Sequence, residues 1–295
     1  MTEPLYSVII PTYNRPDLLD RAIESALAQT QTPFEVVVVD DWSQPPADVP
    51  SDSRVRLVRL PANRGNAAAR NAGLAAARGR WITYLDDDDV LLPTMAERSL
   101  AALEQSDLPA PVAVISGLEV VGPDGRVIER RLPPTLPRGF HFALEEAPAG
   151  TSFLSKQTLF VERDVLRSIG GFDAAFRSRA PSELFLRLNP VCSLLGLPEV
   201  TYRQFRHPGA RVSTDPGLRR ASFAQLVAKH EALLRAHPRG FARLLAEHAR
   251  MLHKQGDWLG AVDALWKAAG CDPAIVWQLL PSRRLRLPRR QRSAG

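Results

Sequence analysis

The four consecutive aspartates Asp86, Asp87, Asp88 and Asp89 are the residues whose chemistry is most distinctive. They follow the apolar residues 81–85, which we expect to form a buried strand. Carboxylates this close together raise each other's pKa unless a cation lies among them. Oxygen ligands of this kind suit Mg²⁺ or Mn²⁺, and Mg²⁺ commonly completes its coordination with phosphate oxygens and water. The cluster therefore predicts a Mg²⁺ or Mn²⁺ site that binds a diphosphate, with a solvated acidic turn as the alternative.

Polar residues also follow two other apolar segments. Residues 11–14 come directly after residues 6–10, and Asp40 and Asp41 come after residues 34–39. A carboxylate such as Asp41 can accept hydrogen bonds from a nucleobase or ribose, and Tyr13 offers a ring on which a base can stack. A turn at the end of a strand is the alternative for Asp41, and a place in the core is the alternative for Tyr13.

The segment 63–73 is rich in glycine and alanine and carries Arg64 and Arg70. Small residues let a helix approach a sheet closely, and an arginine at such a place neutralises phosphate charge. The segment therefore predicts a helix beside a diphosphate site. A tightly packed helix with outward-facing arginines is the alternative.

The elements that must position these residues alternate between apolar segments and amphipathic helices. We expect strands at residues 6–10, 34–39, 55–60 and 81–85, with helices at 16–29 and 67–77 between them. Such an alternation predicts an α/β fold with a mainly parallel sheet that is covered by helices on both faces. Ligands bind beyond the carboxyl ends of such strands, so the three polar segments should meet in one cleft.

The second half of the chain is less regular. A turn is expected at residues 123–125, and the proline-rich residues 133–148 have the character of a loop over an active site. From residue 222 the pattern is almost entirely helical. We expect a catalytic domain over residues 1–215, a helical C-terminal extension over 216–282, and a basic, disordered tail over 283–295.

Composition narrows the class of protein. The 295 residues include only two cysteines, Cys192 and Cys271, which stand in no metal-binding or redox motif and favour a reducing compartment. No segment has the roughly 18 apolar residues of a membrane span, and the start of the chain does not have the character of a signal peptide. The net charge of +6 is concentrated after residue 282, where six arginines occur without an acidic residue. We expect a cytoplasmic protein, with peripheral contact at the inner membrane face through this tail left open. Nucleic acid is not an expected partner, because no recognition motif accompanies the arginines.

Several motifs, taken in order, resemble family 2 glycosyltransferases. The matching segments are SVIIPTYNR from Ser7, VDDWS from Val39, NRGNAAARNAG from Asn63, YLDDDD from Tyr84 and GGFD from Gly170. The resemblance covers residues 5 to about 215. It implies a GT-A fold, of the Rossmann-like nucleotide-diphospho-sugar transferase type, and an inverting transfer from a nucleotide-sugar donor.

The resemblance also implies residue roles. Asp41 would contact the nucleobase, Tyr13 would stack on it, and Asp86 with Asp88 would form the Asp-x-Asp pair in which Asp88 binds the metal. His207 is similar to a late histidine that closes over the metal or diphosphate in some relatives, with a surface-loop histidine as the alternative. The complete donor site is expected to comprise Pro11, Tyr13, Asn14, Asp41, Arg70, Asp86 and Asp87. The donor would be a UDP-, GDP- or dTDP-sugar.

One departure from the family pattern concerns the general base. Family members usually carry Glu-Asp shortly after Gly-Gly-Phe-Asp, and that aspartate deprotonates the acceptor, whereas this chain has Ala180 and Pro181 there. Glu183 is the nearest carboxylate, and we expect it to be the catalytic base, with Asp173 as the second candidate and a first-turn acid as the alternative role of Glu183.

The expected activity is metal-dependent transfer of a sugar to a hydroxyl of a glycan, a lipid-linked acceptor or a protein. The rival interpretation is a non-catalytic nucleotide-sugar-binding protein with a degenerate base site.

Overall fold

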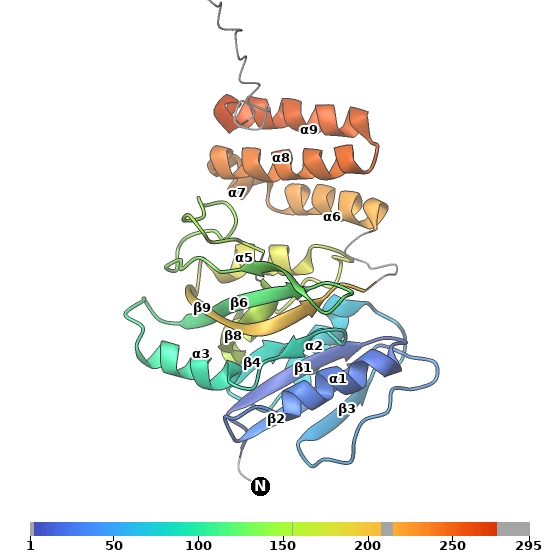
Figure 1. Cartoon of the computed structure of the whole chain (residues 1–295). Coiled ribbons are helices and arrows are strands. Elements are labelled where there is room, and N and C mark those ends of the chain that lie inside the picture. The colour runs from blue at the N-terminus through green and yellow to red at the C-terminus, as the bar shows by residue number, and fades with distance from the viewer. Residues whose placement is uncertain (1–2, 155, 208–214, 276–295) are drawn as a thin grey trace, which may run out of the picture. The chain divides into compact units, whose positions relative to one another are not determined.

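The computed structural model describes residues 3–154, 156–207 and 215–275 (Figure 1). They belong to two compact units, Met1–His230 and Glu231–Gly295. Each unit is described by itself.

The first half of unit 1 is a parallel α/β layer. Its strands lie in the order β3-β2-β1-β4, and each neighbouring pair is parallel. The strands are β1 (Tyr6–Thr12), β2 (Phe34–Asp40), β3 (Val55–Arg59) and β4 (Trp81–Tyr84). The connecting helices include α1 (Pro16–Leu27) and α2 (Asn66–Ala76). Every residue of β1, β2 and β4 is buried, which explains their mostly apolar character, and the buried Glu35 of β2 is paired with Arg56 at 2.8 Å.

The second half of the sheet is mixed. The order continues β4-β8-β6-β9-β5, in which β8 is antiparallel to both neighbours, β6 is parallel to β9, and β5 is antiparallel to β9. These strands are β5 (Val90–Leu91), β6 (Val112–Val121), β8 (Leu159–Glu162) and β9 (Ser193–Phe205), with β7 (Val127–Arg131) paired to β6. The expected α/β class is confirmed, and the parallel arrangement is confined to the N-terminal strands and the β6–β9 pair.

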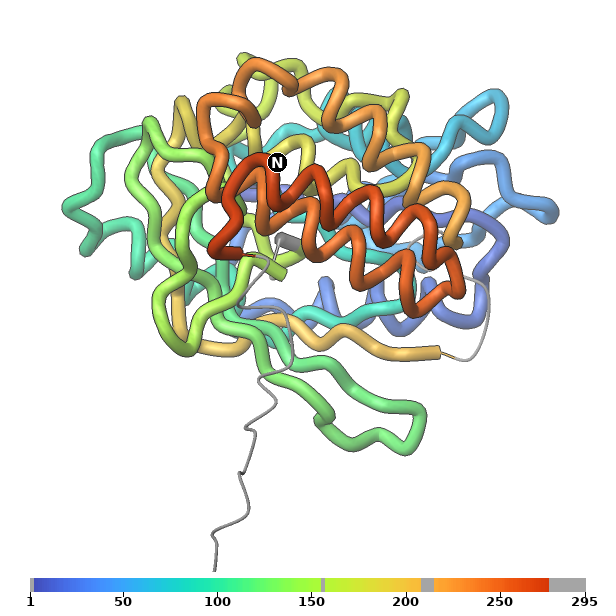
Figure 2. The backbone as a smooth tube through the Cα atoms, turned by 90° about the horizontal axis from the view of Figure 1, so that it is seen from above, coloured from blue at the N-terminus to red at the C-terminus, as the bar shows by residue number. Residues whose placement is uncertain are grey.

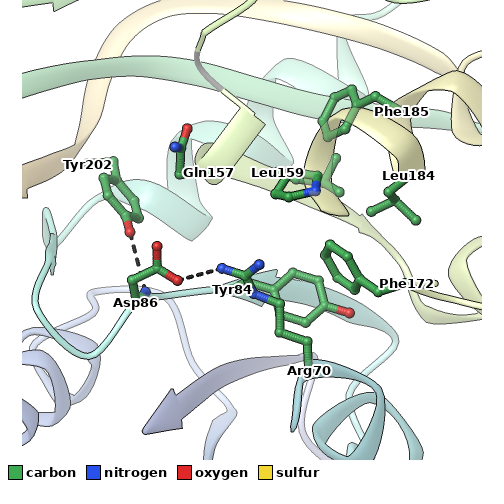
Figure 3. Close-up of a pocket in the computed structure, with 10 residues that line it drawn as sticks. Arg70, Tyr84, Asp86, Gln157, Leu159, Phe172, Leu184, Phe185 and Tyr202 are labelled. Carbon is green, nitrogen blue, oxygen red and sulfur yellow. Dashed lines mark hydrogen bonds and ion pairs between the residues drawn. The ribbon is translucent and has the colours of Figure 1, made fainter. Parts of the chain in front are cut away.

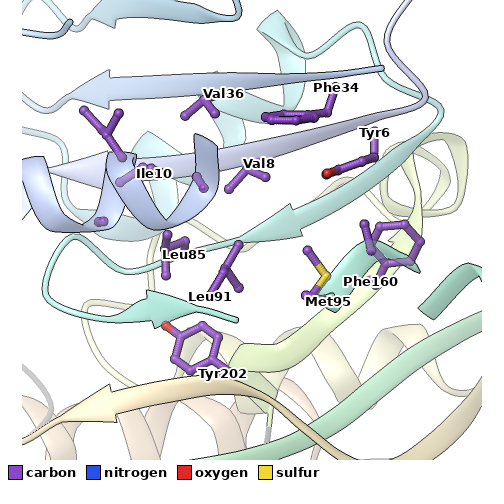
Figure 4. Close-up of a cluster of buried hydrophobic side chains, with 14 of the residues drawn as sticks. Tyr6, Val8, Ile10, Phe34, Val36, Leu85, Leu91, Met95, Phe160 and Tyr202 are labelled. Carbon is purple, nitrogen blue, oxygen red and sulfur yellow. The ribbon is translucent and has the colours of Figure 1, made fainter. Parts of the chain in front are cut away.

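Helices complete unit 1. They are α3 (Met95–Glu104), the short 3₁₀ helix η1 (Lys156–Thr158), α4 (Arg163–Ser168), α5 (Ala180–Leu188) and α6 (Pro216–Lys229). One buried cluster joins the two halves of the sheet (Figure 4). In it Tyr6 stacks on Phe34 with ring centroids 5.3 Å apart, and Tyr6 also meets Phe160 of β8 edge-on at 6.1 Å.

Unit 2 is helical, as expected for the C-terminal extension. It contains α7 (Glu231–Ala236), α8 (Pro238–Lys254) and α9 (Trp258–Cys271). Helices α8 and α9 lie side by side and antiparallel (Figure 2). Gly256, at φ +80°, makes the turn between them, and Asp257 caps α9 by accepting a 2.9 Å hydrogen bond from Gly260 N.

Unit 2 begins after α6, although a boundary at residue 215 was expected. Helix α6 belongs to unit 1, where Lys229 pairs with Asp173 at 2.6 Å. The expected basic tail over 283–295 lies outside the described residues. Among the helices described here, none combines the length and the apolar character needed to cross a bilayer.

Candidate active site

A cleft of about 460 Å³ lies where β1, β2 and β4 end. Its walls include most of the predicted donor residues and one predicted metal ligand, namely Pro11, Tyr13, Asp41, Arg70, Asp86 and Asp87 for the donor and Asp88 for the metal. The strands are parallel and in register, so their carboxyl ends meet at one edge of the sheet. The predicted convergence of the three polar segments is therefore observed.

Three carboxylates at the end of β4 form a group that can hold a cation. Asp86, Asp88 and Asp89 each offer one oxygen, and these oxygens all lie within 4.8 Å of one another. An all-oxygen donor set of this kind fits Mg²⁺ or Mn²⁺ rather than a thiolate- or imidazole-binding metal.

Asp87, the fourth aspartate, is tied to the first strand and its loop. Thr12 Oγ1 donates to Asp87 Oδ2 at 2.8 Å, and Arg15 Nη1 lies 3.1 Å from Asp87 Oδ1 and 3.2 Å from Asp88 Oδ2. Burial raises the pKa of Asp87 to about 6, although the Arg15 charge and the Thr12 hydrogen bond oppose that rise. Asp87 therefore joins β4 to the loop after β1.

Asp89 is buried and connects the cluster to β9. Its carboxylate accepts hydrogen bonds from the Tyr202 hydroxyl at 2.8 Å and from Phe205 N at 2.9 Å. The same hydroxyl accepts a 3.3 Å hydrogen bond from Asp86 N. Burial, together with the charges of Asp86 and Asp88, raises the pKa of Asp89 well above its usual range. A cation in the cluster would offset that cost of ionisation.

Arg70 holds Asp86 in place (Figure 3). Its Nη2 donates to Asp86 Oδ1 at 2.5 Å, while the guanidinium lies 5.8 Å from the ring centre of Tyr84 and 5.2 Å from that of Phe172. These contacts surround a small cavity of about 20 Å³ beside the main cleft. Because the ion pair and the two rings fix the guanidinium, Arg70 presents its charge at a defined place on the cleft wall.

Asp41 organises the part of the cleft wall that lies before α2. Both carboxylate oxygens accept backbone hydrogen bonds of 2.7 Å, one from Arg64 N and one from Gly65 N. Gly65 has φ +87°, a conformation that favours glycine, and it is the residue before α2. Tyr13 stands nearby with 45% of its surface exposed, so its ring is accessible for stacking.

Asn14 and His207 do not line the cleft but lie next to residues that do. Asn14 connects the loop after β1 to the loop after β2, because its backbone N–H donates to Ser43 Oγ at 2.9 Å and its side chain accepts from Gln44 N at 2.8 Å. His207 Nε2 lies 3.4 Å from the backbone oxygen of Asp88. The histidine is thus beside the acidic cluster, at the last residue before a gap in the described chain.

The interpretation of Glu183 as the general base is corrected by its surroundings. Its side chain has no exposed surface and lies 2.6 Å from Arg187 Nη2, 2.8 Å from Lys229 Nζ and 3.2 Å from His230 Nε2. Burial opposes its ionisation, yet hydrogen bonds from His230, Arg187 and Lys229 outweigh burial and hold the pKa of this carboxyl well below its usual range. A fully buried and strongly stabilised carboxylate is a poor proton acceptor.

The second candidate base, Asp173, is also engaged. Its carboxylate is 2.6 Å from Lys229 Nζ, and that hydrogen bond lowers its pKa. The cleft wall at this side instead presents Ala180 and Pro181. Among the described residues, the carboxylates that line the cleft are those of Asp41 and Asp86–Asp89 alone.

Sequence reasoning missed several residues of the site. Arg15 and Tyr202 hold the aspartates, and Arg177 and Arg179 line the cleft. Thr12, which donates to Asp87, lies in the polar segment 11–14 that was expected at the cleft. Arg15 directly follows the polar segment after β1, and this position could have predicted that Arg15 lies at the site. Nothing in the sequence indicated Tyr202, because it approaches from β9, far along the chain.

The sequence model of the family described as glycosyl transferase family 2 matches residues 7–169. The chain belongs to glycosyl transferase family 2. The matched residues include β2, β4, all four aspartates and β1 except Tyr6, and thus the part of the cleft wall that these elements provide.

Curated relatives agree with this assignment. The glycosyltransferase is 46% identical over 127 residues to the succinoglycan biosynthesis protein ExoO of Rhizobium meliloti, a match that covers 42% of this chain and 36% of ExoO. It is 28% identical over 216 residues to an uncharacterized glycosyltransferase of Haemophilus influenzae, with 72% of each chain covered. The chain thus matches little more than a third of the length of ExoO.

Solved structures share the fold. The glycosyltransferase resembles residues 1–349 of TarS from S. aureus in complex with UDP-GlcNAc, with a TM-score of 0.62 at 18% identity over 93% of this chain and 83% of that one. A second TarS structure, in complex with UDP, also gives a TM-score of 0.62, at 19% identity over 93% of this chain and 82% of that one. These neighbours confirm the GT-A type of fold expected from the sequence.

Proposed function

We propose that this family 2 glycosyltransferase moves a sugar from a nucleoside diphosphate sugar to an acceptor oxygen, with inversion at the anomeric carbon and with Mg²⁺ or Mn²⁺ as cofactor. The observation that carries the proposal is the carboxylate group of Asp86, Asp88 and Asp89 in the same cleft as Asp41 and Tyr13. UDP-, GDP- and dTDP-sugars are the donors that this arrangement suits. That TarS has been solved with UDP and with UDP-GlcNAc supports a donor of this class.

Different residues would bind different parts of the donor. Tyr13 provides a ring for the nucleobase, and Asp41 accepts hydrogen bonds from the base or ribose while it holds the loop before α2. Asp86 and Asp88 would hold the cation, with Asp88 as the direct ligand and His207 beside it. Arg70 keeps Asp86 oriented through its 2.5 Å ion pair. When bound, the cation neutralises the negative charge that develops on the leaving diphosphate.

A donor screen tests the proposal. The full chain is incubated with UDP-, GDP- and dTDP-sugars, with and without Mn²⁺ or Mg²⁺, and nucleotide release and thermal stabilisation are measured. We expect stabilisation by at least one nucleotide sugar that disappears when the metal is chelated. If no nucleotide sugar stabilises the protein or releases nucleotide, the proposal is wrong.

A non-catalytic nucleotide-sugar-binding protein is the second candidate. It is favoured by one observation, namely that Ala180 and Pro181 line the cleft where the family usually places its base. It predicts metal-dependent binding of a nucleotide sugar without turnover. Single-turnover transfer to any acceptor would exclude it.

A further inference from the structure

The carboxylates that could accept a proton from an acceptor hydroxyl are few. The residues outside the described ranges, 1–2, 155, 208–214 and 276–295, contain no aspartate or glutamate. Every carboxylate side chain of the protein is therefore placed in the structure. Glu183 and Asp173 are engaged by cations away from the cleft, so the acids on its walls are Asp41 and Asp86–Asp89.

Those remaining carboxylates are committed to other tasks. Asp41 accepts two backbone hydrogen bonds, Asp87 is held by Thr12 and Arg15, and Asp89 is held by Tyr202 and Phe205. Asp86 and Asp88 belong to the group of carboxylates that could hold a cation. A positioned base normally contributes about a hundred- to ten-thousand-fold to the transfer of a neutral hydroxyl. Among the described residues, the walls of the cleft present no histidine and no carboxylate beyond those already engaged.

The same wall of the cleft is positively charged. Arg177 and Arg179 line it next to Ala180 and Pro181. The Arg177 guanidinium is exposed and lies over Gly65, with its Cζ 3.5 Å from the position that a Cβ on Gly65 would take. Within the described residues, Arg177 has no carboxylate partner. The guanidinium of Arg179 lies 5.1 Å from the ring centre of Phe223 on α6.

We propose that the acceptor is a phosphate monoester, whose oxygen is already ionised and is held by Arg177 and Arg179. Guanidinium groups bind phosphate through paired, charge-assisted hydrogen bonds. A phosphate oxygen attacks the anomeric carbon, and the bond from that carbon to the donor's β-phosphate oxygen breaks with its electrons staying on the nucleoside diphosphate. The products are a glycosyl phosphodiester and the nucleoside diphosphate, so no proton has to be removed. This inference rests on the proposed donor chemistry.

The test compares acceptors that differ only in the attacking group. A long-chain alkyl phosphate, the matching alcohol and the matching carboxylic acid are each incubated with the full chain, Mn²⁺ and the nucleotide sugars. We expect transfer to the phosphate at a rate at least about a hundredfold above the alcohol, the lower bound of what a missing base costs. Equal or faster transfer to the alcohol or to the carboxylic acid would overturn the inference.

A measurement of nucleotide binding distinguishes a failure of the phosphate-acceptor inference from a failure of the proposed function. Isothermal titration with UDP, GDP and dTDP in Mn²⁺ reports the donor site alone. Binding without transfer to the phosphate contradicts the inference only, whereas no binding of any nucleotide contradicts the proposed function.

A variant pair tests the role of the arginines. Arg177→Ala should raise the KM for the alkyl phosphate more than about tenfold while nucleotide affinity changes less than about twofold, since one charge-assisted phosphate contact is worth about 1.5–3 kcal/mol. Arg98→Ala on α3 removes an exposed arginine that does not line the cleft and should change neither quantity. If Arg177→Ala weakens nucleotide binding instead, the arginine serves the donor and the assignment to the acceptor is wrong.

A second inference comes from an independent feature, the exposed side of α9. Four large apolar residues stand there with high exposure, namely Trp258 at 64%, Leu259 at 86%, Val262 at 51% and Trp266 at 76%. The opposite side of the helix buries Ala261, Ala264 and Ala268. At about 100° per residue, the four exposed side chains fall within an arc of about 100°. They form one apolar face, which we name the α9 face.

We infer that the α9 face binds the surface of a bilayer that contains anionic lipid. Tryptophan is enriched where an apolar region meets the polar headgroups. The sequence that follows α9 supplies the complementary charge, because Arg283, Arg284, Arg286, Arg289, Arg290 and Arg292 occur there without an acidic residue. Basic residues next to a membrane are attracted by the negative charge of its anionic lipids.

Vesicle sedimentation tests this surface with the full chain. We expect binding to phosphatidylcholine vesicles that contain phosphatidylglycerol, and at least about tenfold weaker binding to phosphatidylcholine alone. Leu259→Ser with Trp266→Ser should weaken binding at least about tenfold. The matched control, Val127→Ser with Ile128→Ser, removes exposed apolar residues from β7 and should leave binding unchanged.

Two results would overturn the lipid assignment. One is binding to both kinds of vesicle that the α9 variant does not weaken. The other is a dimer in solution that the α9 variant dissociates, because a second copy of the chain would then be the occupant of the face.

Discussion

Acidic residues that look alike in the sequence differ in this protein because of what surrounds each carboxylate. Asp89 is buried and receives only hydrogen bonds from Tyr202 and Phe205, so its pKa is raised. Glu183 is equally buried but is contacted by Arg187, Lys229 and His230, so its pKa is lowered. The positions of the motifs in the sequence predicted which acidic residues line the cleft. They could not predict the partners of Glu183, since Lys229, the last residue of α6, and His230, which follows it, lie far from Glu183 in the sequence.

The prediction on metal binding concerns Asp88. Asp88→Asn removes one negative charge from the three carboxylates that could hold the cation. The metal-dependent affinity for the donor nucleotide should therefore fall more than about tenfold, as changes around a bound metal commonly cause. Titration with UDP, GDP and dTDP in Mn²⁺ measures this. Asp164→Asn, at an 85% exposed side chain on α4, is the control and should bind normally. Unchanged metal-dependent affinity in Asp88→Asn would contradict the assignment.

Asp41 should affect donor binding more than chemistry. Asp41→Ala removes the acceptor of the Arg64 and Gly65 amides and the carboxylate that we propose binds the base or ribose. We expect the donor KM to rise more than kcat falls, the pattern of lost uniform binding. Steady-state kinetics at varied donor concentration measures both quantities. An equal fall in kcat and kcat/KM would instead indicate a role in the transition state.

Glu183 gives a prediction on stability and pH. Removing one member of a buried ion-pair group costs about 3–5 kcal/mol, so Glu183→Gln should lower the free energy of unfolding by about 3 kcal/mol at pH 7. Because the folded-state pKa of Glu183 is lowered, its contribution is present above the unfolded pKa of about 4.3 and is lost as pH falls below that value.

Urea unfolding of the wild type and of Glu183→Gln at pH 7 and at pH 3.5 measures this contribution. The difference between the two proteins should be smaller at the acidic pH, and nucleotide binding at pH 7 should stay near that of the wild type. A difference that grows on acidification would show that the lowered pKa does not stabilise the fold.

At the scale of elements, the strand and helix pattern of the first half followed directly from the sequence. Strands β1, β2 and β4 are buried on both faces, so their apolar segments were unambiguous, and the parallel βα units fixed the place of the cleft. The order β8-β6-β9 was not predictable, because these strands are separated by long loops and their direction depends on tertiary pairing. Tyr202 reaches Asp86 only through that pairing.

The turn at Gly170 and Gly171 allows a matched test of packing between elements. Both residues have positive φ, +77° and +64°, but a Cβ on Gly171 would lie 2.6 Å from Asn71 Oδ1, whereas one on Gly170 meets nothing within 4 Å. Asn71 exchanges hydrogen bonds of 2.7 and 2.8 Å with the backbone of Phe172, which joins α2 to this turn.

Each alanine should therefore cost about 1–2 kcal/mol for the left-handed backbone, and Gly171→Ala should cost at least about 1 kcal/mol more for the contact with Asn71. Thermal and urea unfolding of the two variants measure the difference. Equal destabilisation by both would show that Asn71 moves aside freely and that the turn does not depend on this contact.

At the scale of the whole molecule, the sequence indicated a helical extension but not where the first unit ends. The helical pattern is nearly continuous from residue 222, so it did not reveal that α6 belongs with the sheet. Contacts at the C-terminal end of α6 join it to unit 1, because Lys229 pairs with Asp173 and Glu183, and His230 pairs with Glu183. Together, α6 and His230 provide two of the three cationic partners of the buried Glu183.

The last prediction concerns where the chain can be shortened. A chain that ends at His230 retains every partner of Glu183, whereas a chain that ends at Asp215 leaves this buried carboxylate with Arg187 alone. An incompletely compensated buried charge is strongly destabilising. The shorter chain should therefore unfold at a temperature at least about 5 °C lower, because about 1 kcal/mol corresponds to about 2–4 °C for a protein of this size. Scanning calorimetry of both chains measures the shift, and the effect of Glu183→Gln in each identifies its source. The substitution should destabilise the chain that ends at His230 and have little effect in the shorter one. Equal melting temperatures for the two chains would show instead that the contacts of α6 with Glu183 do not stabilise unit 1.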